Sequence, residues 1–483
     1  MVMPARRQGV RFWHWLGLIG GVMIAAGGVL AGAAPAHDPM LLLPGVAELR
    51  DATVFATAVV YVGLTLLLVA WWRVGALVRR PDGPSVRGLM KTGVWWTLPF
   101  LLIAPIFSRD VYSYLAQGAM AMAGMNTYKV GPSALGGQLG ANVPAIWQDT
   151  PAPYGPVFLN LANGVAHLTQ QSTWPGIIGM RMLALTGVGL VAWSVPRLAH
   201  ASGVDPAVAV WLGVLNPLVL LHLVADAHND ALMLGLMTAG LVLALRGRPW
   251  LGVVAITLAG LVKAPAAVAI AFVVPIWAGR LAVGTRWVRA ACGALAAAAG
   301  TAVVFTTLAG TGYGWVGTLK TPTLARTWMS VTTDLGYVSG QALHWLGLAT
   351  VDQTRDAFWL AGLVVAAAVF MFLLRRSTQV GPVAALGLCL AALVVLAPVV
   401  HPWYLLWGCI PLAAAGSDAM RRGVAVLSAL LVIFVLPGGV PPGLPVLLGA
   451  AIGVVVALLA LGALGYQLRR QPLPVSELAA AER

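Results

Sequence analysis

Long runs of apolar residues, separated by short polar segments, repeat along almost the whole chain. A run of about 20 apolar residues lets a helix cross the hydrocarbon core of a bilayer, and a shorter run suits a helix that crosses only part of it. The pattern predicts an all-α polytopic membrane protein with about 13 to 14 transmembrane helices. These helices are expected near residues 12–32, 53–72, 90–107, 177–197, 206–225, 230–246, 249–262, 264–280, 288–310, 357–374, 380–400, 403–416, 422–436 and 444–466.

Two longer and more polar segments interrupt this series, at residues 108–176 and 311–356. Neither they nor any other stretch is polar enough to suggest a separate soluble domain. We therefore interpret residues 1–483 as a single integral membrane domain that carries two long loops.

The composition supports this interpretation. Hydrophobic residues make up 60% of the chain, charged residues only 9%, and the mean hydropathy is +0.88. A soluble chain carries about 25% charged residues. A chain embedded in a bilayer cannot, because each Asp, Lys or Arg at the centre of a helix costs about 2.5–3.5 kcal/mol.

The distribution of charge predicts the orientation in the membrane. Threading the expected helices alternately, with the N-terminus in the cytoplasm, places most Lys and Arg residues on the cytoplasmic side, including the pairs Arg79-Arg80, Arg375-Arg376 and Arg421-Arg422. Most Asp and Glu residues then fall on the other side. This asymmetry is typical of membrane proteins. It predicts a multi-pass protein of the cell membrane with cytoplasmic termini and both long loops outside.

The net charge of +14 does not indicate a nucleic-acid partner, because the basic residues form short clusters between apolar runs and are not interleaved with aromatic residues. The three cysteines, Cys292, Cys389 and Cys409, lie inside apolar runs without metal-like spacing. They predict neither disulfides nor a zinc site.

Polar residues gather on the predicted outer face. They lie in Ser108-Arg109-Asp110-Val111-Tyr112-Ser113-Tyr114, Gly124-Met125-Asn126-Thr127-Tyr128, Pro153-Tyr154-Gly155-Pro156, Asp226-Ala227-His228-Asn229-Asp230 and His401-Pro402-Trp403-Tyr404, and at Lys263, Lys320, Arg326 and Asp334. An acid near a membrane interface is usually only solvated. Asp110 is a stronger candidate because it follows an apolar run, next to Arg109 and before two tyrosines. A carboxylate in such a setting suits a general base that acts on a sugar hydroxyl.

The other candidates each have a structural alternative. In the 226–230 cluster, Asn229 or Asp230 could cap a helix, or the cluster could bind a metal, although its spacing is not diagnostic. Lys263 could extend harmlessly to the interface or hold a lipid phosphate, and the same choice applies to His401. Trp403 fits an interfacial aromatic belt, together with Tyr404 and Trp407.

Taken together, the Asp110–Tyr114 motif, the Gly124–Tyr128 motif, the Pro-Tyr-Gly-Pro turn and His228-Asn229-Asp230-Ala231 resemble the polyprenol-phosphomannose-dependent α-(1→6)-mannopyranosyltransferases of actinobacteria. The resemblance extends over about residues 90–410. It implies a GT-C glycosyltransferase-like helical bundle with an extracytoplasmic active site beside the first long loop. In many members that loop follows the first span, whereas here it follows the third expected span.

The resemblance also implies the reaction and its partners. Mannose would move from polyprenyl-phosphate mannose to a lipid-anchored mannan, forming α-(1→6) links in lipomannan and lipoarabinomannan core synthesis at the bilayer. The class uses an Asp or Glu near the start of the first long loop as catalytic base, and Asp110 matches that position. The donor is β-linked and the product α-linked, so one displacement with inversion suffices, without a metal or other cofactor.

The site residues expected from this scheme fall into two further groups. The candidates for neutralising the leaving phosphate are Lys263, Arg326, Arg109 and His401. The candidates for substrate contacts are Tyr112, Tyr114, Asn126, Tyr154, Asp226, His228, Asn229, Asp230, Asp334 and Trp403. Two alternative functions remain open, namely a transferase for another lipid-phosphate sugar, such as arabinofuranose, and a transporter or flippase of lipid-linked sugars. A transporter is expected to show mid-membrane charges and inverted repeats, and the sequence shows neither clearly.

Overall fold

The protein is described by a computed structural model that covers residues 5–324, 329–439 and 443–470. Every regular element in these ranges is a helix, which confirms the all-α prediction. The α-helices are α1 (Ala5–Ala31), α2 (Val46–Asp51), α3 (Thr53–Val78), α4 (Val86–Thr97), α5 (Asp110–Met122), α6 (Gly137–Asn142), α7 (Ala145–Gln148), α8 (Pro156–Leu168), α9 (Thr173–Ala201), α10 (Pro206–Gly213), α11 (Asp230–Leu245), α12 (Pro249–Gly260), α13 (Ala269–Ala278), α14 (Arg286–Ala309), α15 (Val331–Trp345), α16 (Val351–Val380), α17 (Pro382–Leu396), α18 (Leu405–Ala415), α19 (Asp418–Ile433) and α20 (Leu444–Arg470). Short helices of other types are η1 (Pro39–Leu42), η2 (Leu98–Phe100), η3 (Pro132–Ala134), the π-helix η4 (Val219–Ala225), η5 (Ala264–Val268), η6 (Gly314–Leu324), η7 (Pro402–Tyr404) and η8 (Pro437–Gly439).

The prediction of a multi-pass membrane protein is confirmed. Six helices in the described ranges, within α1, α3, α9, α14, α16 and α20, are long and apolar enough to cross a membrane, and η4 with α11 makes a seventh if the bent pair is one span. Four apolar helices are shorter, at Pro249–Gly260, Ala264–Ala278, Pro382–Leu396 and Pro402–Ala415. Every expected helix overlaps an observed one, but the number of full-length spans is well below the predicted 13 to 14.

Two of the expected spans are broken. Residues 90–107 form α4, which ends just before the Leu98-Pro99-Phe100 turn. Residues 206–225 form α10 and then η4, with Asn216 and Pro217 between them. Proline has no N–H to donate and stops a preceding helix, and the Asn216 side chain accepts the N–H of Leu218 at 3.0 Å.

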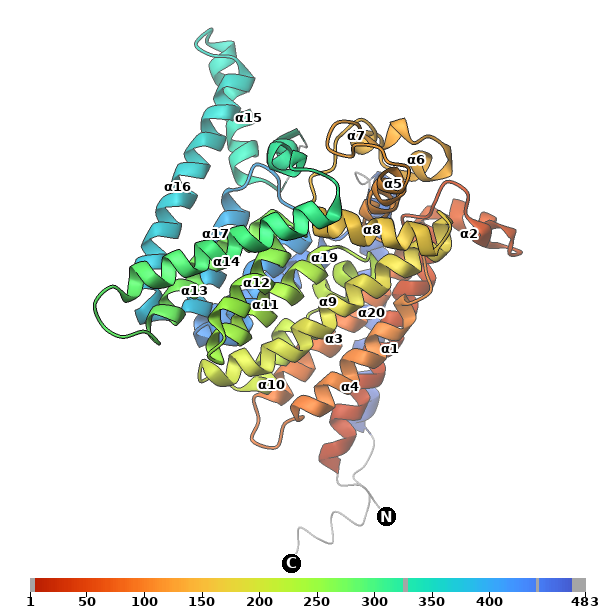
Figure 1. The fold of residues 1–483 in the computed structure, drawn as a ribbon. Coiled ribbons are helices and arrows are strands. Elements are labelled where there is room, and N and C mark those ends of the chain that lie inside the picture. Colours follow the sequence, from red (N-terminus) through yellow and green to blue (C-terminus); the bar gives the residue numbers. More distant parts are fainter. Residues whose placement is uncertain (1–4, 325–328, 440–442, 471–483) are drawn as a thin grey trace, which may run out of the picture.

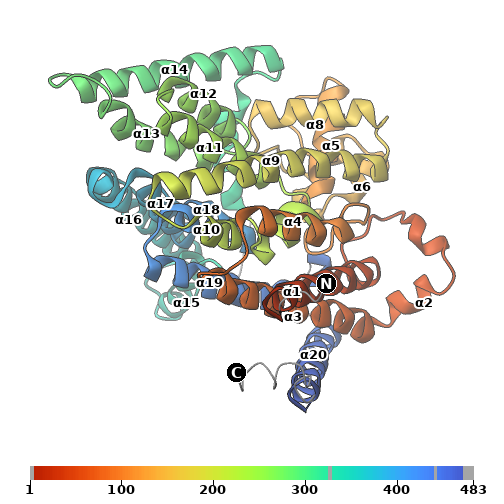
Figure 2. The same cartoon turned by 90° about the horizontal axis from the view of Figure 1, so that it is seen from below.

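The helices pack as one bundle. α3 packs between α1 and α20, whereas α11 packs between α9 and α12, and α12 in turn contacts α14. Figure 2 shows α20 and α14 at opposite edges of this arrangement. The segment 108–176 is helical rather than an open loop, and α5 to α8 lie at the end of the molecule opposite to the start of α1 (Figure 1).

A sharp bend in the centre of the bundle positions the polar cluster 226–230. The axes of η4 and α11 meet at 110°, and Ala227 in the bend adopts a φ of 54°, which is uncommon for a residue other than glycine. The fully buried Arg181 of α9 supports this bend. It donates hydrogen bonds to the carbonyls of Val224 and Ala225, at 3.1 and 2.7 Å, and also to carbonyls in the linker after α4. Arg181 therefore joins the bend to the segment that precedes α5.

Candidate active site

A cavity of about 420 Å³ lies where the first polar segment meets the C-terminal half of the bundle. Its volume falls within the range of about 300–1,000 Å³ that small-molecule sites occupy. The lining residues are Asp110, Ser113, Gln117, Trp147, Thr150, Pro151, Pro153, Tyr154, Lys263, Ala264, Pro265, Thr321, Leu393, Ala397, Pro398, Val399, His401, Tyr404 and Trp407. Most of them are apolar or aromatic, and the polar ones gather on α5 and near Lys263.

One face of α5 supplies three polar side chains to the cavity. Asp110, Ser113 and Gln117 follow one another at spacings of three and four residues, which places them on the same side of a helix. Ser113 and Gln117 are almost fully buried, yet Ser113 Oγ and Gln117 Oε1 have no hydrogen-bond partner among the described residues. Buried polar atoms are nearly always paired, so the two unpaired atoms mark this face of α5 as a candidate for polar contacts with a ligand.

Asp110 lies at the start of α5 and lines the cavity. It occupies the first turn of α5, where the helix dipole favours a negative charge, and a quarter of its side chain is exposed. Burial raises the pKa of Asp110 to about 6, while the charge of Lys263 acts in the opposite direction. The raised pKa makes this carboxylate more basic than an ordinary Asp.

Lys263 follows α12 and is held by a network of its own. Its Nζ atom lies 2.7 Å from Oδ2 of the fully buried Asp230, and Trp407 Nε1 donates to Oδ1 of the same carboxylate at 2.6 Å. The ammonium also lies 4.7 Å from the ring centroid of Tyr404, a distance at which cation–π attraction operates. The lysine is thus paired inside the protein and only 12% exposed, and Asp230 pairs with it instead of capping α11.

The Pro-Tyr-Gly-Pro turn is joined to the segment before Lys263. A Cβ atom at Gly155 would lie 2.2 Å from the carbonyl oxygen of Leu261, so only glycine permits this approach. The N–H groups of Gly155 and Phe158 face the carbonyls of Val262 and Leu261, each at 3.4 Å. This contact brings Tyr154 and Lys263 to the same cavity.

An aromatic stack leads from the cavity into the protein. The His401 ring, which lines the cavity, stacks on Trp403 with centroids 4.4 Å apart, and Trp403 stacks on His228 at 4.0 Å. Trp403 and Trp407 are each only 5% exposed. The alternative of an interfacial aromatic belt is therefore wrong for these two tryptophans, because they pack inside the protein around charged groups.

His228 connects Asp110 with the bend. Its Nδ1 atom lies 3.5 Å from Asp110 Oδ2 and 3.3 Å from the hydroxyl of Tyr114. The Tyr114 hydroxyl donates to Asn229 at 3.5 Å, and its ring contacts Tyr154 edge to face. Asn229 makes no side-chain capping bond to α11, so the capping alternative does not apply to it.

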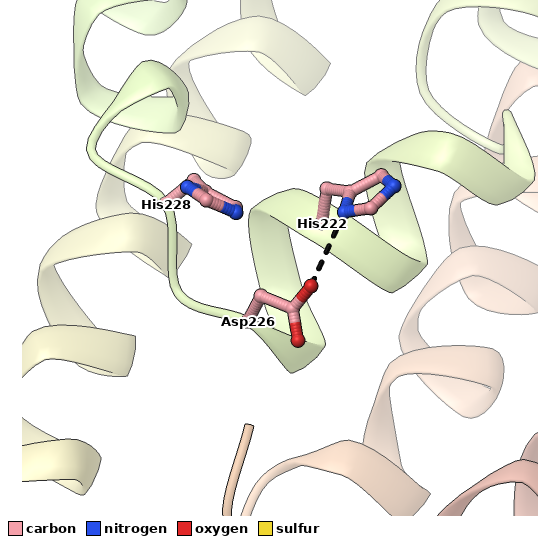
Figure 3. A group of neighbouring side chains, drawn as sticks. All are labelled: His222, Asp226 and His228. Atoms are coloured by element: carbon pink, nitrogen blue, oxygen red, sulfur yellow. Dashed lines mark hydrogen bonds and ion pairs between the residues drawn. The ribbon is translucent and has the colours of Figure 1, made fainter. Parts of the chain in front are cut away.

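Asp226 lies deeper and does not line the cavity. Its Oδ1 atom accepts the backbone N–H groups of Ile106 and Phe107 at 2.8 and 2.9 Å, and its Oδ2 atom lies 3.1 Å from Nδ1 of His222. Figure 3 shows His222, Asp226 and His228 as one group, drawn from η4 and the bend after it. Asp226 thereby fixes the linker that leads directly to Asp110.

Several expected site residues lie elsewhere. Arg109 donates to the carbonyls of Ala34 and Asn142, and the Tyr112 hydroxyl donates to the carbonyl of Ala33. Asn126 and Asp334 do not line the cavity either. The exposed Asn126 accepts the N–H of Tyr128, and Asp334 is exposed on α15. Arg326 lies outside the described residues. Their proposed roles remain predictions.

No sequence pattern singled out Ser113, Gln117, His222 or Arg181 as site residues. For Ser113 and Gln117 a signal existed, because they lie three and seven residues after Asp110 on a helix. For His222 and Arg181 no local signal existed. Both lie in apolar runs, and the residues that they contact are determined only by the fold.

Comparison with known proteins agrees with the resemblance. Residues 14–279 match the family described as "Alpha-(1->6)-mannopyranosyltransferase, N-terminal domain", and residues 332–464 match the "MptB C-terminal domain". A probable alpha-(1->6)-mannopyranosyltransferase of Mycolicibacterium smegmatis is 37% identical over 462 residues, which cover 86% of this chain and 81% of that protein.

Two further relatives have similar coverage. Alpha-(1->6)-mannopyranosyltransferase B of Corynebacterium glutamicum is 35% identical over 506 residues, covering 96% of this chain and 83% of the relative. Alpha-(1->6)-mannopyranosyltransferase A of Mycobacterium tuberculosis is 37% identical over 431 residues, covering 86% and 82%. No solved structure matches the chain.

Proposed function

The chain belongs to the alpha-(1→6)-mannopyranosyltransferase family and is a membrane mannosyltransferase, and we propose that its donor is polyprenyl-phosphate mannose. The proposed acceptor is a lipid-anchored mannan that is extended during lipomannan and lipoarabinomannan core synthesis. The reaction takes place on the extracytoplasmic side of the cell membrane, with both termini in the cytoplasm. Nucleotide sugars stay in the cytoplasm, so a donor carried by a membrane lipid is the natural source of mannose at this site.

The observation that supports this proposal best is the composition of the cavity. It holds a carboxylate, Asp110, and a cation, Lys263, together with an apolar wall that continues to Leu393 of α17. A base and a cation are what the transfer of a sugar from a phosphate requires, and the apolar wall suits a polyprenyl chain. Ser113 and Gln117 add unpaired polar atoms for sugar hydroxyls.

The proposed chemistry is a single displacement with inversion. Asp110 takes the proton of the acceptor 6-hydroxyl as its oxygen forms a bond to the anomeric carbon of mannose. The bond between that carbon and the phosphate oxygen breaks, and polyprenyl phosphate leaves with the bonding electrons. A β-linked mannose on the donor thereby becomes an α-(1→6)-linked mannose in the product.

The leaving phosphate gains negative charge, and Lys263 is the cation closest to this role. It lines the cavity and is only 12% exposed, so its charge is weakly screened. His401 lines the same cavity and could donate a hydrogen bond. Arg109 uses its guanidinium on backbone carbonyls instead.

The choice of donor is directly testable with the purified protein. Synthetic polyprenyl-phosphate β-mannose with a short α-mannoside acceptor is expected to give an α-(1→6)-linked product. A nucleotide-linked mannose without lipid phosphate is expected to react at least about 100-fold more slowly, since it lacks the apolar chain that the cavity wall receives. The measurement is product formation by mass spectrometry, with the linkage determined by nuclear magnetic resonance.

Two results would contradict this donor. A rate of mannose transfer from the nucleotide sugar equal to that from the polyprenyl-phosphate donor would contradict the proposed lipid donor. No transfer from any polyprenyl-phosphate sugar by well-folded protein would favour a flippase, which a lipid-scrambling measurement in proteoliposomes would then reveal.

Gln117 is expected to contribute to sugar binding. Replacing Gln117 by Leu removes its hydrogen bonds while keeping a similar shape, so the KM for one substrate should rise about 3- to 10-fold, as expected for one neutral hydrogen bond. Gln341→Leu, at an exposed position on α15, is the matched control and should leave KM unchanged. Unchanged KM values in Gln117→Leu would exclude Gln117 from the sugar subsite.

A further inference from the structure

Behind the cavity, three side chains with metal-binding atoms converge. His222 in η4 and Asp226 and His228 in the bend each offer one ligand atom, and these atoms lie within 4.8 Å of one another. All three residues are at most 1% exposed. Histidine nitrogen and carboxylate oxygen are the usual ligands of zinc and similar divalent ions in proteins.

An unpaired nitrogen points into this cluster. His228 is fully buried, and its Nε2 atom has no hydrogen-bond partner among the described residues. Figure 3 shows one ring nitrogen of His228 directed towards the space between His222 and Asp226. Because Nδ1 of His228 faces Asp110 and Tyr114, the nitrogen directed into the cluster is Nε2.

Asp226 is oriented so that one oxygen is left for the cluster. Its Oδ1 atom is fixed by two backbone N–H groups, and its Oδ2 atom lies 3.1 Å from Nδ1 of His222. Two ligands that hold Zn²⁺ at about 2.0–2.2 Å in a tetrahedral site lie about 3.3 Å apart. The same separation also fits a simple hydrogen bond, but a hydrogen bond between His222 and Asp226 leaves His228 Nε2 unpaired.

We propose that His222 Nδ1, Asp226 Oδ2 and His228 Nε2 bind one divalent transition-metal ion, with Zn²⁺ as the best match to two imidazoles and one carboxylate. The three ligand atoms lie within 4.8 Å of one another, so binding of the ion would draw them closer together. None of the three ligands lines the cavity, so the ion does not touch the leaving phosphate, and the displacement proposed above still needs no metal at the reacting atoms.

The ion would act on the reaction through His228. A metal-bound imidazole usually donates its other N–H to a carboxylate, which fixes the tautomer and the ring orientation. With Nε2 on the metal, Nδ1 carries the proton and faces Asp110 Oδ2 at 3.5 Å. The ion and His228 therefore position the proposed base. This role rests on the proposed function, whereas binding of the ion does not.

Metal binding is tested without an activity assay. Full-length protein is purified in detergent, stripped with a chelator and titrated with Zn²⁺, and its metal content is measured by plasma mass spectrometry. We expect about one Zn²⁺ per chain. His222→Gln and His228→Gln should bind at least about 10-fold more weakly, whereas His200→Gln, at an exposed position on α9, should bind like the parent.

Other outcomes of this titration would overturn the site. The proposed metal site is rejected if the folded parent takes up no ion. It is also rejected if His222→Gln and His228→Gln bind the ion as tightly as His200→Gln does. If these variants do not fold, the proposed site is tested instead by the absorption spectrum of the parent protein loaded with Co²⁺. This spectrum reports whether nitrogen and oxygen ligands surround the ion.

The positioning role needs a kinetic readout. Removing the ion should lower kcat for mannose transfer and leave the acceptor KM nearly unchanged, and Zn²⁺ should restore kcat. Full activity of the metal-free protein would overturn the positioning role while the binding site stands. Stoichiometric Zn²⁺ in a protein that transfers no mannose would contradict the proposed function instead, so the two failures are distinguishable.

Discussion

An enzyme carrying Asp110→Asn is expected to transfer mannose about 10²- to 10⁴-fold more slowly than the parent, which is the range associated with loss of a general base. Asparagine keeps the size of the side chain and its place in the first turn of α5, but it cannot accept the proton of the acceptor hydroxyl. The effect should fall on kcat, because the cavity that binds both substrates is left in place. The measurement is initial rates with polyprenyl-phosphate β-mannose and a short mannoside.

Asp51→Asn is the matched control, since Asp51 is exposed on α2 and does not line the cavity. This control should transfer mannose at the parental rate. Both proteins must elute as the parent does in size-exclusion chromatography. A folded Asp110→Asn enzyme within about threefold of the parent would show that the base is another group.

Removing the charge of Lys263 is expected to lower kcat/KM for the donor about 10²- to 10³-fold, because one preorganised positive group that stabilises developing negative charge contributes about that much. The single variant Lys263→Met is ambiguous on its own. It leaves Asp230 as a buried unpaired carboxylate, and breaking a buried ion pair costs about 3–5 kcal/mol of stability.

The double variant Lys263→Met with Asp230→Asn resolves this ambiguity. It removes both charges, so the protein should regain much of the stability that Lys263→Met loses, and a thermal unfolding measurement shows whether it does. If Lys263 neutralises the leaving phosphate, the double variant folds but stays inactive. Restored transfer in the double variant would mean that Lys263 serves only as the structural partner of Asp230.

Much of the candidate site was predictable because charged and polar residues are costly inside a bilayer. Asp110 and Lys263 stand out in the sequence since each interrupts or follows an apolar run. The structure places both of them, with Tyr154 and His401, in the lining of one cavity. The apolar runs also predicted helices that each overlap an observed helix, because hydrophobic patterning is the strongest local signal of secondary structure.

The break at residues 206–225 was not predicted, although Asn216 and Pro217 lie within it. Hydropathy alone does not distinguish a straight span from α10 followed by a π-helix and a bend of 110°. The bend depends on Arg181, which is distant in sequence and binds carbonyls on both sides of it. Such a contact leaves no periodic pattern in the chain.

His222 and Gly155 show the same limit. His222 lies within the apolar run Leu220–Val224, where a histidine is ordinarily read as part of the core. Gly155 looks like an ordinary turn residue. However, a side chain at this position would collide with the carbonyl oxygen of Leu261, which is more than 100 positions away in the chain. Long-range approaches of backbone to backbone are visible only in the folded protein.

The ion pair between Lys263 and Asp230 has a consequence for turnover. The proposed donor carries a phosphodiester with one negative charge, whereas the polyprenyl phosphate that would leave approaches two at neutral pH. A free lysine in a weakly screened cavity would hold this more highly charged product more tightly than the substrate. Because Asp230 competes for the same ammonium at 2.7 Å, the resting cavity is close to electroneutral there. With the proposed donor, we therefore expect the spent lipid to exchange readily for a fresh donor and to inhibit the enzyme only weakly.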